Sequence, residues 1–60
     1  MIDMTGLWAV CGAGRIGLIQ REGHRGGAPC WFGVGLDGRA WQSICPQILN
    51  PTDQAILNER

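Results

Sequence analysis

The fold of this chain is decided by residues 31–44, which read WFGVGLDGRAWQSI. Two largely apolar runs, residues 31–36 and 39–44, are separated there by the dipeptide Asp37-Gly38. An Asp-Gly pair between such runs is the strongest short-range signal for a β-hairpin, because both residue types tolerate the backbone conformation of a tight turn. The sequence therefore predicts two antiparallel strands with their turn at Asp37-Gly38.

The pairing of these two strands determines which side chains face the core. With a two-residue loop, Leu36 lies opposite Arg39 and Val34 lies opposite Trp41. This register predicts one core face, which consists of Phe32, Val34, Leu36 and Trp41. Trp31 then lies on the other face, whereas a longer, bulged loop shifts the register by one residue and exchanges the two faces.

The chain on either side of this hairpin reads as short strands. Two are predicted at residues 7–11 and 15–21, with a turn at 12–14 between them. Residues 22–29 contain three glycines and a proline, which predicts an exposed loop. Residues 47–49 are expected to form either a short last strand or a single helical turn.

A short helix is predicted at about 51–58, because Asn50 is a good N-cap and Pro51 fits the first helical position. Together these elements predict one small domain over residues 1–60, with its core within about 5–49. The expected fold is mainly β, with four to five antiparallel strands and the short C-terminal helix.

Composition excludes several classes of protein. The chain has 60 residues, 45% of them hydrophobic, and its formal net charge is zero. This balance indicates a folded domain and not a strong nucleic-acid binder. No apolar run approaches the roughly 20 residues of a membrane span, so we expect a cytoplasmic protein without membrane contact. The middle of the chain is mildly basic, which leaves weak nucleic-acid or anion binding open, through Arg15, Arg21, Arg25 and Arg39.

The cysteines and the histidine form no recognisable chemical site. Cys11, Cys30 and Cys45 are widely spaced and include no Cys-x-x-Cys pair, so we expect neither a zinc site nor a disulfide framework. The one histidine, His24, lies in a glycine-rich segment where a solvent-exposed side chain is expected. We therefore predict no catalytic residue, no metal and no cofactor.

A dinucleotide-binding motif supports the main alternative. Residues 12–17 read GAGRIG, a Gly-x-Gly-x-x-Gly pattern. In such sites the glycines corresponding to Gly12, Gly14 and Gly17 let the backbone approach a pyrophosphate at a helix N-terminus. Asp37 follows the motif at about the 20-residue spacing of the acidic residue that holds the ribose.

The chain from residue 10 to residue 18 resembles the start of nicotinamide-dependent dehydrogenases, and this resemblance implies an NAD(P)-binding oxidoreductase or a fragment of one. In those proteins a helix follows the motif. Here the glycines and the proline of residues 22–29 would interrupt such a helix. An interior glycine makes a helix about 1 kcal/mol less stable than alanine does, and proline about 3 kcal/mol less stable. A helix over 16–28 would favour the enzyme, and a strand over 15–21 would favour a glycine-rich β domain, which is our interpretation.

The order of elements resembles the SH3-like small β-barrels, with short strands, a long early loop, a glycine-rich core and a terminal helix. Residues 12–19 resemble the KOW-type segment of such barrels, in which glycines and an apolar strand follow the first turn. The resemblance implies a module that binds RNA or protein. Because this chain lacks the basic character usual in RNA-binding members, a protein partner or self-association is favoured.

We therefore predict a small non-enzymatic interaction module, for which homo-oligomerisation would help so short a chain to bury enough surface. Its expected binding surface combines Trp31 with Arg15, Arg25, Arg39 and the loop at 22–29. An exposed tryptophan beside glycines forms a flat apolar surface suited to a peptide or a base. On this prediction, Trp31→Ala leaves the fold intact and abolishes binding.

Overall fold

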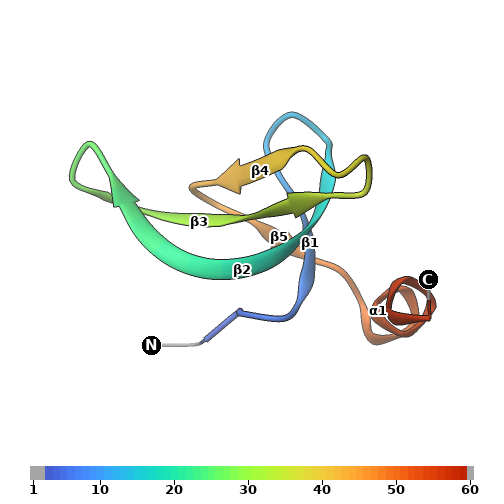
Figure 1. Ribbon diagram of the computed structural model, residues 1–60. Coiled ribbons are helices and arrows are strands. Elements are labelled where there is room, and N and C mark those ends of the chain that lie inside the picture. The colour runs from blue at the N-terminus through green and yellow to red at the C-terminus, as the bar shows by residue number, and fades with distance from the viewer. Residues whose placement is uncertain (1–2, 60) are drawn as a thin grey trace.

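The computed structural model describes residues 3–59 and confirms a mainly β domain with a short C-terminal helix (Figure 1). Its strands are β1 (Trp8–Val10), β2 (Ile16–Arg25), β3 (Ala28–Gly35), β4 (Ala40–Ser43) and β5 (Gln47–Ile48), and its helix is α1 (Pro51–Asn58). The strands pair antiparallel in one sheet with the order β4-β3-β2-β1-β5. β4 and β5 are the two edges of this sheet, which is not closed.

The hairpin of β3 and β4 forms as predicted, but its register is shifted by one residue. Trp41 pairs with Gly33 and not with Val34, because the loop has three residues and ends at Gly38. Gly38 has a φ of 81°, the left-handed conformation that closes a three-residue hairpin loop. The predicted two-residue register is therefore wrong: Trp41 stays in the core, but β3 turns its other face inward, so that Trp31 and not Phe32 lies beside it.

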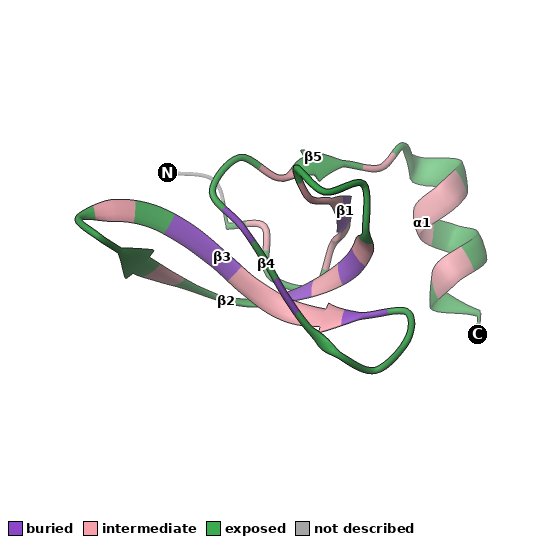
Figure 2. Ribbon diagram, turned by 90° about the horizontal axis from the view of Figure 1, so that it is seen from above, coloured by how far each residue is buried: buried purple, intermediate pink, exposed green. Residues whose placement is uncertain are grey.

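A second hairpin replaces the exposed loop that the sequence predicts at residues 22–29. β2 continues to Arg25 and β3 starts at Ala28, so only Gly26 and Gly27 connect them. Their φ angles of 60° and 83° suit the two-residue turns that match the twist of paired strands. The predicted loop is wrong because these glycines make a tight turn, which lies at the opposite end of the molecule from α1 in both views (Figures 1 and 2).

The long strand β2 changes register within its own length. Ile19 pairs with Gly33 and Arg21 pairs with Phe32, so Gln20 is an extra residue that forms a β-bulge. A bulge increases the local twist and bends its strand. Figure 1 shows the result, with β2 curved and both β4 and the β1–β2 turn on its concave side.

The core is small and lies on one face of the sheet, which we call the core face. Ala9, Ile19, Trp31 and Trp41 form a single buried cluster. Trp31 is only 7% exposed, so the expectation that it lies on an open surface is wrong. The shifted register explains this, because Trp41 pairs with Gly33, and Trp31 lies two residues before Gly33 and therefore on the same face of β3. Three residues of the predicted core, Phe32, Val34 and Leu36, are half-buried or exposed instead.

The helix α1 begins where the sequence predicts, with Asn50 as its N-cap. The Asp53 amide donates to Asn50 Oδ1 at 2.8 Å. Gln54 then joins the helix to β1, because Trp8 N–H donates to Gln54 Oε1 at 2.8 Å and Gln54 Nε2 donates to the Trp8 carbonyl at 2.7 Å. The Trp8 indole also donates to Asn58 Oδ1 at 2.9 Å. Within the described residues, no helix is both long enough and apolar enough to cross a membrane.

Candidate binding groove

The glycine motif at residues 12–17 lies in a β-hairpin. Gly14 has a φ of 81°, and its amide donates to the Cys11 carbonyl at 2.9 Å, which closes the turn between β1 and β2. Gly17 lies within β2, where an added Cβ would overlap the indole of Trp41. A dinucleotide site needs a helix directly after such a motif. Residues 16–25 form a strand, so this motif has no helix N-terminus at which to hold a pyrophosphate.

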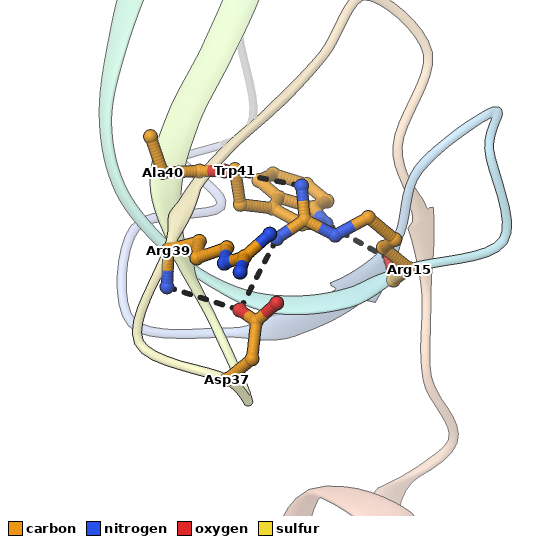
Figure 3. Close-up of polar contacts among 5 residues, drawn as sticks. All are labelled: Arg15, Asp37, Arg39, Ala40 and Trp41. Atoms are coloured by element: carbon orange, nitrogen blue, oxygen red, sulfur yellow. Dashed lines mark hydrogen bonds and ion pairs between the residues drawn. The ribbon is translucent and has the colours of Figure 1, made fainter.

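Arg15 connects the β1–β2 turn to the hairpin of β3 and β4 (Figure 3). Its guanidinium donates to the Ala40 carbonyl at 3.1 Å and to Asp37 Oδ1 at 3.2 Å. In return, the Trp41 indole donates to the Arg15 carbonyl at 2.9 Å. Arg15, predicted as a ligand-binding residue, is thus engaged within the fold, and its partners hold the curled sheet together at this point.

Asp37 is a turn residue whose carboxylate accepts two hydrogen bonds. The amide of Arg39 donates to Asp37 Oδ1 at 3.0 Å, and the guanidinium of Arg15 donates to the same oxygen. The Arg39 amide lowers the pKa of this carboxyl, partial desolvation opposes that effect, and the charge of Arg15 adds to the lowering, so the net pKa lies below the usual value. The dinucleotide hypothesis assigned Asp37 to a ribose contact. In the structure, its carboxylate instead accepts hydrogen bonds from Arg15 and Arg39.

The outer edge of β4 carries free backbone groups, which follow from its pairing with β3. The Gly35 amide donates to the Arg39 carbonyl at 2.8 Å, which makes these two residues a hydrogen-bonded pair. Hydrogen-bonded pairs alternate along an antiparallel ladder, so Trp41 and Ser43 also bond toward β3. The backbone groups of Ala40 and Gln42 therefore point away from the sheet.

A groove lies between this free edge and the β1–β2 turn. One part has a volume of about 450 Å³ and includes Cys11, Ala13 and Arg15 on one side and residues 40–42 on the other. The adjoining part has about 420 Å³, and Gln42 lines both parts. These volumes fall in the range of sites that hold small ligands or short chain segments. The Ala40 carbonyl at this edge accepts a hydrogen bond from Arg15. Gln42 is therefore the outward-facing position of β4 whose backbone groups are both available to a ligand.

The second part of the groove combines apolar, polar and cationic groups. Its lining consists of Gly12, Arg25, Cys30, Gln42, Ser43, Ile44 and Cys45. Ile44 is 62% exposed, a large value for an isoleucine beside a groove. Arg25 is the cationic side chain of this lining and has no ion pair among residues 3–59. The groove can therefore offer a strand edge, an apolar contact and one positive charge.

The thiol of Cys11 lies where the first part of the groove meets the turn. Partial desolvation raises its pKa, but hydrogen bonds from the backbone of Arg15 and Ala13, together with the charge of Arg15, outweigh this and lower the pKa overall. All three cysteines of the chain are free. Among the described residues, no group of three or more His, Cys, Asp or Glu side chains is placed to hold a metal ion.

The structure brings together only part of the predicted binding surface. Arg25 lines the second part of the groove and Arg15 lines the first part, where it is also paired with Asp37. Arg39 lies in the hairpin next to that ion pair. Trp31 belongs to the core and does not line the groove. The sequence reading missed Gln42 and Ile44. The available signal was that Gln42 lies on the second strand of the predicted hairpin and Ile44 at its end, because such a strand can be a sheet edge.

The comparisons with known proteins identify no relative. No protein-family model matches the chain, and no curated protein or solved structure matches it significantly. The functional interpretation therefore rests on the geometry of the groove. That geometry provides recognition groups, and it places no nucleophile beside a general base in the described part of the chain.

Proposed function

We propose that this protein is a non-enzymatic binding module that takes up an extended peptide segment as an additional strand beside β4. The observation that carries the proposal is the outward-facing backbone of Gln42 at a sheet edge that borders a groove. Strand addition gives affinity through main-chain hydrogen bonds, and neighbouring pockets give specificity for alternate side chains. Membership of the SH3-like barrels is part of this proposal and is supported by the small size, the curled five-stranded sheet and the terminal helix.

The lining of the groove indicates the chemistry of the peptide. Ile44 offers apolar surface, so an apolar side chain on the peptide would be buried there. Arg25 offers a positive charge, so an acidic side chain nearby would be attracted. We therefore infer an extended, alternating apolar segment with an acidic residue at one end.

Calorimetric titration with two capped hexapeptides of alternating threonine and valine tests this proposal. One peptide ends in glutamate and the other in lysine. We expect the glutamate peptide to bind more tightly, and Arg25→Ala to remove the difference between the two. Equal binding of both peptides to the native protein would contradict the charge assignment.

A proline at the strand edge tests strand addition itself. Gln42→Pro removes the outward N–H but no hydrogen bond to β3, and proline is tolerated in edge strands with this orientation. The matched control Gln42→Ala removes the side chain and keeps the N–H. We expect Gln42→Pro to abolish binding and Gln42→Ala to retain it, with the Trp41 indole resonance confirming that both variants are folded. Loss of binding in both variants, or in neither, would overturn the proposal.

A further inference from the structure

We propose that a second copy of this chain covers the face of the sheet opposite the core, which we call the second face. Residues that pair directly across strands share a face. Trp8 pairs with Leu18, which pairs with Val34, and Val10 pairs with Ile16 in the adjacent row. All five of these side chains are apolar and half-buried. They form a continuous apolar surface across β1, β2 and β3.

Among residues 3–59, no strand is layered over the second face. The five strands form one sheet, which curls toward its core (Figure 1), so the second face is the outer side of the sheet. Stable domains bury a sheet face against another layer. Among the described residues, α1 is the only helix; it meets the second face at the Trp8 indole, through Asn58, and it has no buried residue. The second face therefore lacks the layer that its apolar side chains require.

The size of the molecule is compatible with a dimer. A standard interface buries about 800 Å² on each partner, and the molecule as a whole extends 35 by 25 Å along its two longer axes. Only five described apolar residues are buried in the core, which is few for an independently stable domain. A formal net charge of zero means that two copies do not repel each other through their overall charge.

The charges at the two ends of the molecule favour a second copy in antiparallel orientation. The β2–β3 hairpin and α1 lie at opposite ends (Figures 1 and 2). On the half of β2 that leads to this hairpin, the guanidinium of Arg21 lies 4.4 Å above the Phe32 ring and has no ion pair among residues 3–59. At the other end, α1 has Asp53 in its first turn, no basic residue in its last turn, and Glu59 following it. A two-fold axis between stacked faces would bring Arg21 of each copy toward the acidic residues of the other.

Sedimentation equilibrium of the full chain tests the dimer. We expect a mass twice the 6.5 kDa of the monomer. Leu18→Lys, which places a charge in the centre of the second face, should give a monomer. Because Leu18→Lys could also unfold the chain, Arg21→Glu and Glu59→Arg at exposed positions provide the second test. Each should weaken the dimer about tenfold, and the double variant should restore it. Arg39→Glu, in the β3–β4 hairpin, is the matched control and should leave the dimer unchanged.

A monomeric native protein at millimolar concentration would overturn the proposal. So would a dimer that the Arg21→Glu, Glu59→Arg and Leu18→Lys variants leave unchanged, or a double variant that does not recover. Peptide binding at β4 is read out separately, because Gln42→Pro removes peptide binding while the dimer persists. Failure of the dimer and failure of the peptide groove are therefore distinguishable.

Discussion

The indole of Trp41 lies directly against the backbone of Gly17. A Cβ atom added at Gly17 would lie 2.5 Å from Cδ1 and 2.7 Å from Cδ2 of that ring. Such distances are far shorter than a van der Waals contact, so only glycine fits at this position. The last glycine of the Gly-x-Gly-x-x-Gly pattern is therefore explained by packing, and no nucleotide is needed to account for it.

Replacing Gly17 with alanine should destabilise the fold. The added methyl group forces the Trp41 ring to move within a packed core, and overpacking of this kind costs about 1–3 kcal/mol. Gly12→Ala is the matched control, because a Cβ there meets no atom within 4 Å. Urea denaturation followed by tryptophan fluorescence should place Gly17→Ala well below the native protein and Gly12→Ala near it. Equal stability of the two variants would refute the packing explanation.

Trp31→Ala should unfold the protein or nearly so, contrary to the sequence-based expectation of an intact fold. The ring is buried in the core cluster, and truncation of a buried aromatic residue costs about 3–5 kcal/mol. A domain of this size has a total stability of about 3–9 kcal/mol. Ile44→Ala, at a side chain that is 62% exposed, should change the stability by no more than about 0.5 kcal/mol. Thermal melts by circular dichroism compare the two, and a cooperative melt of Trp31→Ala near the native temperature would show this assignment to be wrong.

Gln54→Ala should release α1 from β1. The side chain makes three hydrogen bonds, to the Trp8 amide and carbonyl and to the Leu49 carbonyl. At about 0.5–1.5 kcal/mol for each of the three bonds, we expect a loss of about 1.5–4.5 kcal/mol. Gln47→Ala removes an exposed glutamine from β5 and serves as control. The Trp8 indole resonance reports the result directly, and an unchanged resonance in Gln54→Ala would contradict this role.

The ionised form of Asp37 should stabilise the folded state at neutral pH. Its pKa is lowered in the folded state, so its contribution is present above the unfolded pKa of about 3.9 and is lost as the pH falls through the lower folded value. Asp37→Asn should therefore lose less stability than the native protein between about pH 5 and pH 2. Asp3, whose pKa is also lowered through its hydrogen bonds with Thr5, will keep part of the acid dependence in that variant. Urea denaturation at a series of pH values measures this difference, and identical pH dependence would argue against the Asp37 contacts.

Short sequence motifs predicted much of this fold, whereas the remainder depends on how strands that are distant in the sequence pair with each other. The Asp37-Gly38 turn and the Asn50-Pro51 helix start each depend on a few adjacent residues, and both were predicted correctly. The register of β3 and β4 was not predicted correctly, because an Asp-Gly pair fits loops of either two or three residues. A shift of the pairing by one residue reverses which face of β3 lies on the core side. That reversal moved Trp31 from the expected surface into the core.

The candidate groove could not be predicted from the sequence, because it too depends on how the strands pair. Gln42 lies in β4 and Ile44 directly follows that strand, and they form a site only because β4 is an edge that faces the β1–β2 turn. Which strand is the edge depends on the order of all five strands. Arg25 was predicted as a surface cation and does line the groove.

Hydrogen exchange at the Gln42 amide is the most direct measurement of the central claim, that the free edge of β4 is the binding surface. The ¹⁵N-labelled protein would be compared with and without a saturating amount of the glutamate-ended hexapeptide. We predict that exchange at Gln42 slows strongly, while Trp41 and Ser43, whose amides already bond to β3, change little. Unchanged exchange at Gln42 with the peptide bound, or protection confined to another strand, would contradict the account.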